Sequence, residues 1–249
     1  MKITFLEATN GVALSKQISR DGIKNYPMVK NVTSHEHTIA ADETGLMTLE
    51  QYVRDYSNKG YCLLKGNLRE PLTNESRAKK TDRMEYTQLL VLDIDKLLVP
   101  NTAIRQKNLN SGDVQSLAEK ILDQMPPAFQ ETSYIAQASA SFGLDPSKVS
   151  IHIFMFLTVP MPPKALKLWL QYMNYETDLF ENNLTLSSNG QSLAYPLDVS
   201  ISDNSKTVFI APPIFDPKED LLSLEGEEIS DRFLSRAVRL AVDRLVAAV

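Results

Sequence analysis

Hydrophobic residues follow one another without interruption in residues 89–92, and the run ends in Asp93-Ile94-Asp95. A short apolar run bounded by polar residues is typical of a buried strand. Because side chains alternate along a strand, Asp93 and Asp95 are expected on one face and Ile94 on the other, in the core. Two like charges at the end of a buried strand resist ionisation unless a cation lies between them. The pattern therefore predicts a divalent-metal site.

The rest of the chain alternates between strand-like and helix-like patterns. Further strands are predicted for residues 2–6, 61–64, 134–141, 149–157, 192–200 and 206–210. Helices are predicted for residues 48–59, 113–124, 162–182 and 225–249. Thr48 is the expected N-cap of the first helix, and Gly60 its stop. A turn at Gly143 and Pro146 is expected to join two of the strands in a hairpin.

Composition narrows the class of protein. The 249 residues are 43% hydrophobic, an ordinary globular value. One cysteine, Cys62, excludes an internal disulfide framework and a multi-cysteine zinc site, so a reducing cytoplasm is expected. The start of the chain lacks the apolar segment of a signal peptide, and no run reaches the roughly 18 apolar residues of a membrane span. The net charge of −5 argues against indiscriminate polyanion binding but allows a local basic strip.

One candidate for that strip precedes the Asp93 strand. Residues 67–87 are polar and net positive inside an acidic chain. Their basic side chains are Arg69, Arg77, Lys79, Lys80 and Arg83. Such a run is either a solvated face or a surface for the phosphates of a nucleotide or a template strand.

Three further sets of polar residues have candidate chemistry. Ser150 and His152 share one face of a predicted strand, where His152 is either a satisfied core residue or a functional one. Together with nearby Lys148, Ser139 and Ser141, they form a cluster of donors suited to phosphate.

Asp198 ends another apolar segment, and a metal held by Asp93 and Asp95 would supply the partner that a buried carboxylate needs. Asp203 is an alternative to Asp198 as the third carboxylate. His35 and His37 form an H-x-H pair, which we interpret as part of an exposed polar loop because no third ligand is evident nearby.

Three motifs occur in a fixed order: Asp93-Ile94-Asp95, Ser150-Ile151-His152 and Leu197-Asp198. In this order and strand context they resemble the catalytic core of the archaeo-eukaryotic primase superfamily, especially the primase-polymerase domains of phages and plasmids. The resemblance covers roughly residues 48–215. Family members often carry a basic residue, commonly Arg, in the strand after the third motif, whereas this chain has Lys206.

The resemblance implies an α+β fold in which an RRM-like antiparallel or mixed sheet is flanked by helices and joined to a smaller α/β unit. We expect a single catalytic domain over residues 1–249. Its parts would be an N-terminal subdomain at about 1–85, the RRM-like core at 86–215 and a C-terminal helical segment at 216–249. The active site would lie in the cleft between the first two parts.

The implied activity is template-directed nucleotidyl transfer, as a DNA primase or DNA polymerase in phage or plasmid replication. Two Mg²⁺ or Mn²⁺ ions would be held by Asp93, Asp95 and Asp198. His152 and Ser150 would contact the phosphates of the incoming NTP or dNTP. Lys148, Lys206, Ser139 and Ser141 are further candidates for that contact. Arg77, Lys79, Lys80 and Arg83 would bind the DNA backbone.

The expected partners are a single-stranded DNA template, a primer, nucleotides and a replicative helicase in cis or in trans, with no membrane. The expected location is the cytoplasm of a prokaryotic or phage-infected cell. Two other interpretations stay open. Residues 89–98 also resemble the nucleophile strand of haloacid-dehalogenase-type phosphatases, although Leu97 replaces the usual Thr or Val. A catalytically inactive replication-initiation or single-strand-binding module would keep the fold without the chemistry.

Overall fold

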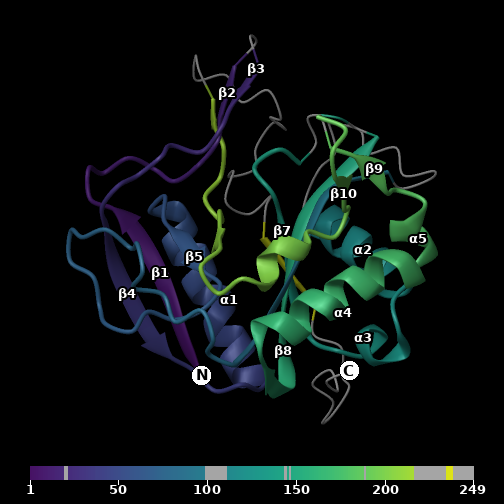
Figure 1. Ribbon diagram of the computed structural model, residues 1–249, viewed down its shortest axis with the longest axis horizontal. Coiled ribbons are helices and arrows are strands. Elements are labelled where there is room, and N and C mark those ends of the chain that lie inside the picture. The colour runs from purple at the N-terminus through teal and green to yellow at the C-terminus, as the bar shows by residue number, and fades with distance from the viewer. Residues whose placement is uncertain are drawn as a thin grey trace.

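Two four-stranded antiparallel sheets form the framework of the protein (Figure 1). The computed structural model describes residues 1–19, 22–98, 111–142, 145, 147–187, 189–215 and 234–237. The first sheet has the order β11-β5-β1-β4 and consists of β1 (Lys2–Ala8), β4 (Val32–Thr38), β5 (Cys62–Leu64) and β11 (Thr207–Val208). The second has the order β13-β7-β8-β6 and consists of β6 (Thr87–Leu98), β7 (Tyr134–Ala138), β8 (Lys148–Met161) and β13 (Leu234–Ala237). The protein is therefore of the α+β class, as predicted.

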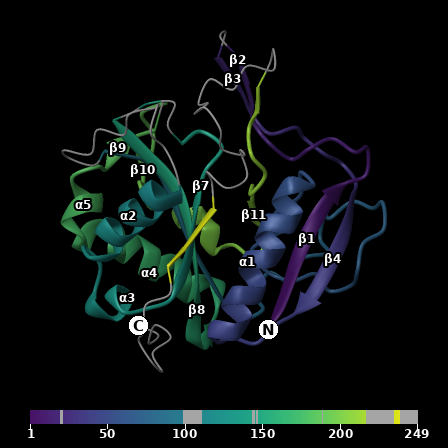
Figure 2. The same ribbon diagram turned by 180° about the vertical axis from the view of Figure 1, so that it is seen from behind.

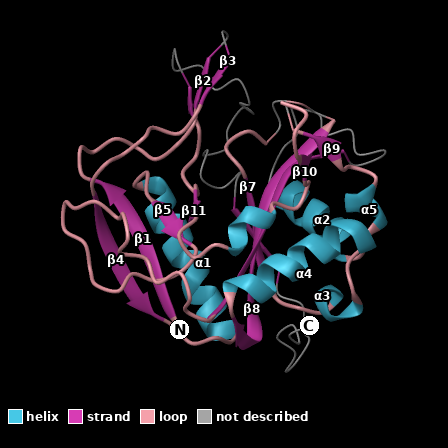
Figure 3. Cartoon of the chain, in the orientation of Figure 1, coloured by secondary structure: helices cyan, strands magenta, loops and turns pink. Residues whose placement is uncertain are grey.

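Helices and short strands complete the described elements (Figure 3). The helices are α1 (Glu43–Asn58), α2 (Ser111–Leu122), α3 (Pro127–Gln130), α4 (Pro163–Glu176), α5 (Asp178–Glu181) and the 3₁₀-helix η2 (Val199–Ser202). The short strands are β2 (Gln17–Ser19), β3 (Gly22–Lys24), β9 (Thr185–Leu186), β10 (Leu193–Ala194) and β12 (Ile214–Phe215). None of the helices in these ranges is long and apolar enough to cross a membrane.

One hydrophobic core runs through both sheets. It extends from Phe5 on β1 to Phe154 on β8, and α1 contacts both β5 and β7. Figures 1 and 2 show α1 between the two sheets, whereas α2 to α5 lie with the second sheet. Continuous apolar runs in β6 and β8 explain why these long strands are buried through their central residues.

The opposite face of the first sheet has a smaller core of its own. Because side chains alternate along β1, Leu6 and Ala8 point away from the face that carries Phe5. Leu68 and Leu72, from the polar segment between β5 and β6, pack onto Leu6 and Ala8 in this second cluster. The basic segment is thus anchored to the sheet by apolar side chains rather than standing free in solvent.

Several predicted elements are confirmed. The run at residues 89–95 lies inside β6, and β7 and β8 pair antiparallel as the predicted hairpin requires. The predicted helix at residues 113–124 corresponds to α2. Gly143 and Pro146, which were expected to form the turn, lie outside the described residues.

Other boundaries were wrong. Helix α1 begins before Thr48, because the side chain of Asp42 accepts a hydrogen bond from the Gly45 amide and caps the helix there. The helix predicted at residues 162–182 is divided at Thr177, whose backbone is extended. Within the strand predicted at residues 192–200, only β10 is a strand, and Val199 begins η2.

The C-terminal prediction was also wrong where it can be compared. Residues 225–249 were expected to form a helix, but residues 234–237 form β13 and pair with β7. Pairing with a strand edge satisfies backbone groups that local helical spacing does not take into account. The remaining residues of that predicted helix lie outside the described residues.

His35 and His37 do not lie in a loop. Both belong to β4, and their rings stack with Tyr61 and Tyr52. His35 Nε2 lies 2.9 Å from a carboxylate oxygen of Glu7, and His37 Nε2 lies 2.8 Å from the Tyr56 hydroxyl. The loop interpretation failed because two histidines can line a partly buried strand when aromatic side chains cover them.

Candidate active site

The three motifs come together around β6. On one side, Asp93 is the register partner of His152 on β8. On the other side, the Asp198 amide donates to the Asp93 carbonyl oxygen over 2.8 Å, and the Asp95 amide donates to the Pro196 carbonyl oxygen over 2.9 Å. Segments that are far apart in the sequence are therefore joined directly by backbone hydrogen bonds.

Residues 196–208, which we call the connector, link the two sheets. Residues 196–198 run beside β6 in the second sheet, whereas Thr207 and Val208 form β11 in the first. Asn174 on α4 fixes the start of the connector: its buried side chain donates to the Leu197 carbonyl oxygen and accepts from the Leu197 amide. This arrangement holds Asp198 next to Asp93.

The pKa values of Asp93 and Asp95 are both raised. Burial is the largest cause of the raised pKa of Asp93, and the charges of Asp95 and Asp198 add to it. Asp95 is more exposed; burial raises its pKa first, and Asp198 raises it further. Lys16 opposes both shifts, and Lys206 opposes that of Asp93. The site thus concentrates negative charge that a cation would stabilise.

Asp198 is oriented by its own helix. Its carboxylate accepts hydrogen bonds from the Ser200 amide, at 2.8 Å, and the Ser200 hydroxyl, at 2.6 Å, and so caps η2. Within the described ranges, no three His, Cys, Asp or Glu side chains are grouped so that they could hold a metal ion. Asp203, the alternative to Asp198, pairs instead with Arg83.

His152 is buried beside Asp93. Its Nε2 atom lies 3.5 Å from Asp93 Oδ1, and its Nδ1 atom lies 3.5 Å from Gln137 Oε1. The Gln137 amide donates in turn to the Ile210 carbonyl oxygen. Burial lowers the pKa of His152 to about 4, so the ring is neutral near pH 7. It can offer one hydrogen-bond donor and one acceptor, but not a positive charge.

Ser150 supports the backbone of the motif. Its hydroxyl oxygen accepts from the Lys96 amide over 2.9 Å, at a β-bulge where β6 shifts register between Ile94 and Leu97. Lys96 has a φ of 55°, in the left-handed region that a lysine adopts only with support from its surroundings. Ser150 therefore fixes the bulge that follows Asp95, in addition to any contact with a ligand.

The other predicted phosphate contacts divide into two groups. Ser139 and Ser141 lie on the Lys16 side of the site. Their hydroxyl oxygens are 3.3 Å apart, and the Lys16 ammonium donates to the Ser141 hydroxyl over 3.4 Å. Lys148, in contrast, forms an ion pair with Asp145 at 2.6 Å. Lys206 is near enough to Asp93 to lower its pKa.

Sequence reasoning missed two residues from the N-terminal part of the chain. Lys16 acts on the pKa of Asp93, Asp95 and His152, and its ammonium lies 5.3 Å from the centre of the Tyr26 ring. Burial raises the pKa of Tyr26, and so do the charges of Asp93 and Asp95. No local pattern marks either residue, because their positions depend on β2 pairing with distant β12.

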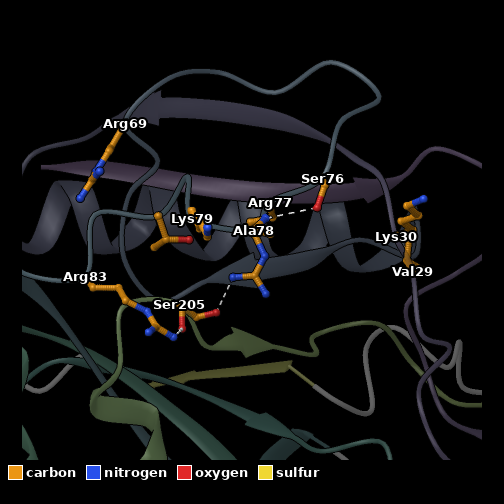
Figure 4. A pocket seen from close by; sticks show the side chains of 10 residues that line it. Val29, Lys30, Arg69, Ser76, Arg77, Ala78, Lys79, Arg83 and Ser205 are labelled. Atoms are coloured by element: carbon orange, nitrogen blue, oxygen red, sulfur yellow. Dashed lines mark hydrogen bonds between the residues drawn. The ribbon is translucent and has the colours of Figure 1, made fainter.

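A second charged region lies over the first sheet (Figure 4). It is a cavity of about 660 Å³ whose lining includes Lys30, Arg69, Arg77, Lys79, Arg83 and Ser205. We call it the basic cavity. Three of the four predicted DNA contacts, Arg77, Lys79 and Arg83, belong to it. Lys80 does not, because it pairs with Glu70 at 2.9 Å and Glu75 at 2.5 Å.

Comparison of the chain with protein-family models, with curated proteins and with solved structures finds no match. The functional argument is therefore carried by the geometry of the two charged regions.

Proposed function

We propose that the protein is a template-directed nucleotidyltransferase, a DNA primase or DNA polymerase built on an RRM-like core of the archaeo-eukaryotic primase type. One observation carries the proposal. Strand β6 with Asp93 and Asp95 lies between the His152 strand and the Asp198 segment, so that the three motifs of the resemblance are adjacent in space. Three motifs that occurred in the sequence by chance would not be expected to lie next to one another in the folded protein.

The chemistry of the three carboxylates suits a hard divalent cation, although in the described structure they are not grouped as a metal site. Asp93, Asp95 and Asp198 offer only oxygen atoms, which suit Mg²⁺ or Mn²⁺, and the charge of Asp198 helps to raise the pKa of both Asp93 and Asp95. When bound, such ions would activate the attacking 3′-hydroxyl and stabilise the pyrophosphate leaving group. The chain's part is to hold the three carboxylates on paired backbone.

The basic residues beside the carboxylates suit the phosphates of the incoming nucleotide. Lys16 and Lys206 act on Asp93 from the segments before β2 and β11, and both are cations. His152 would contribute a neutral hydrogen bond, and Ser141 a hydroxyl close to Lys16. Ser150 serves in this proposal chiefly to shape the bulge that follows Asp95.

The remaining partners follow from the same activity. Single-stranded DNA template and primer would need positive surface for their phosphate backbones. Lys80, which is ion-paired, would contribute little to this contact. NTP or dNTP would be the substrate, and a replicative helicase would act in cis or in trans.

Nucleotide incorporation tests the proposal. With single-stranded DNA, labelled nucleotides and Mn²⁺ or Mg²⁺, we expect the protein to make or extend a short strand. Asp93→Ala and Asp95→Ala should each reduce incorporation by about 10³-fold or more, because several kcal/mol of transition-state stabilisation depend on the metal ligands. Asp55→Ala, an exposed carboxylate on α1, should leave it unchanged.

Other outcomes would overturn the proposal. If no nucleotide is incorporated, or if both alanine variants stay fully active, the catalytic role of these carboxylates is wrong. Release of phosphate from small esters without a template would instead identify a phosphatase. Binding of DNA without either reaction would identify the inactive replication module.

A further inference from the structure

The basic cavity collects positive charge in one place. Five of its lining residues are Lys or Arg, and no carboxylate lines it among the residues that the structure describes. Two of the glutamates of the same segment, Glu70 and Glu75, are paired with Lys80 outside the cavity. The cavity is thus lined by the other basic residues of this segment and by none of its carboxylates.

The cavity is also fixed in shape. Arg77 donates to the Ser205 carbonyl oxygen, and Arg83 donates to the Ser205 hydroxyl over 3.3 Å (Figure 4). A backbone bridge between Leu68 and Thr81 closes the segment, and Leu68 is buried in the second hydrophobic cluster. Two guanidinium groups are thus held near the same residue before any ligand arrives.

The Arg83 guanidinium is close enough to Arg77 to disfavour the charge of Arg77. Burial lowers the pKa of Arg77, and the positive charge of Arg83 lowers it further, although Asp203 acts in the opposite direction. Arg83 pairs with Asp203 at 3.5 Å and is largely exposed. One carboxylate at the edge does not balance five cations, so an anion in the cavity would stabilise them.

The form of the cavity distinguishes between kinds of anion. A nucleic-acid backbone spreads its charges along a strand and is matched by an extended groove or stripe. A cavity of about 660 Å³ has the size of a small-molecule site and is matched by a compact group with several charges. Arginine forks and serine hydroxyls suit phosphate oxygens in particular.

We propose that the basic cavity binds a compact oligophosphate, such as the 5′-triphosphate of a nucleotide, rather than the backbone of a strand. The connector links the cavity to the acidic site, because Ser205 lines the cavity and the next residue, Lys206, lowers the pKa of Asp93. This inference rests on the proposed function. The ligand is then either the triphosphate at the 5′ end of a new strand or the triphosphate of a free nucleotide.

Binding without metal tests this inference. Titration calorimetry in EDTA would use the full chain with tripolyphosphate, with ATP and with a short oligonucleotide that carries either a 5′-triphosphate or a 5′-hydroxyl. We expect tripolyphosphate and the 5′-triphosphate oligonucleotide to bind at least about 10-fold more tightly than the 5′-hydroxyl form. Stronger binding of ATP than of the triphosphorylated oligonucleotide would identify a free nucleotide as the ligand, and the reverse would identify a strand end.

Matched variants locate the binding. Arg83→Gln and Lys79→Ala, two changes at the cavity, should each weaken tripolyphosphate about 10-fold, whereas Lys80→Ala, the same loss of charge outside it, should change binding less than about 2-fold. Arg77→Lys is a further variant that retains the charge but loses the fork. Circular dichroism of each variant shows that it is folded.

The outcomes separate this inference from the proposed function. Equal binding of the two oligonucleotides, or equal effects of Lys79→Ala and Lys80→Ala, would overturn the oligophosphate site. Asp93→Ala should retain tripolyphosphate binding in EDTA. If it does and no nucleotide is ever incorporated, the cavity proposal stands while the nucleotidyltransferase proposal fails.

Discussion

The two sheets of the molecule bury ionisable groups of opposite sign. In the first sheet, Lys65 follows β5, is fully buried and donates to the Thr87 hydroxyl; in the second, β6 carries Asp93 close to Asp95 and Asp198. Burial lowers the pKa of Lys65 to about 7 and raises that of Asp93. Both shifts move the group toward its neutral form, as removal from water requires.

The difference between the two groups lies in their neighbours. The pKa of Lys65 is lowered by burial alone, whereas that of Asp93 is also raised by two other carboxylates. A single buried amine is explained by packing, but three carboxylates brought together by separate segments are a feature that stability alone does not favour. Residues whose mutual repulsion is retained are candidates for function.

Breaking the link between the sheets should have the largest effect. Asn174→Leu leaves the amide and carbonyl of Leu197 without their side-chain partners in a buried place. We expect the free energy of unfolding to fall by about 3 kcal/mol, measured by urea denaturation. Asn182→Leu, at the exposed end of α5, is the matched control and should cost far less. Equal losses in the two variants would show that the connector is not anchored by Asn174.

The buried lysine should make stability depend on pH. The pKa of Lys65 is about 7 in the folded protein against an ordinary 10.5, so the unfolded chain binds more protons between these values. Stability should therefore rise with pH above about 7, by about 2 kcal/mol up to about pH 8.5.

Lys65→Met is the variant that isolates this effect. It removes the buried amine while retaining an unbranched side chain, so the rise should disappear and the variant should be most stabilised, relative to the natural protein, below about pH 7. Lys2, Glu85 and Tyr86 line the same small cavity as Lys65 and stay in place as its charged and titratable neighbours. Parallel pH profiles for both proteins would contradict the assignment. Urea denaturation across this pH range measures it.

Relief of repulsion at the acidic site should have the smallest effect on stability. Asp93→Asn removes one of the three neighbouring carboxylates and keeps the shape of the side chain. In EDTA we expect the free energy of unfolding to rise by about 1 kcal/mol, while nucleotide incorporation with metal is lost. Asp55→Asn on α1 should alter neither quantity. A fall in stability for Asp93→Asn would mean that its charge is compensated within the fold.

Local patterns predicted the parts of the fold that depend on local physics. The run before Asp93 and the hairpin strand of His152 are recognisable because continuous apolar residues suit buried strands. The end of the connector was harder, since η2 depends on a cap from Asp198 rather than on apolar spacing. Strand β13 was missed because its pairing with β7 joins distant parts of the chain.

The candidate site also has parts that local sequence indicates and parts that only the folded chain reveals. Asp93, His152 and Asp198 were selected from the order and strand context of their motifs, and the structure brings them together around β6. Their catalytic role stays a prediction. The difference between Lys79 and Lys80 could not be found, because only the folded segment shows which lysine meets Glu75. The role of Lys16 could not be predicted from local sequence, because its position depends on distant contacts. The hydroxyl of the preceding residue, Ser15, donates to the carbonyl oxygen of Ala211, which is 196 residues away.

Lys16 is held in position by a part of the chain that is synthesised much later than Lys16 itself. The Ile214 amide holds the Lys16 carbonyl oxygen, so Lys16 cannot take its place until the chain has been made past residue 214. At about 5–20 residues per second, a ribosome needs roughly 10–40 seconds to translate that interval. From the synthesis of Asp95 until the chain has passed residue 214, the nascent chain contains Asp93 and Asp95 without Lys16 in its final position. The acidic site is therefore completed only late in synthesis, after β6 and β8 have been made.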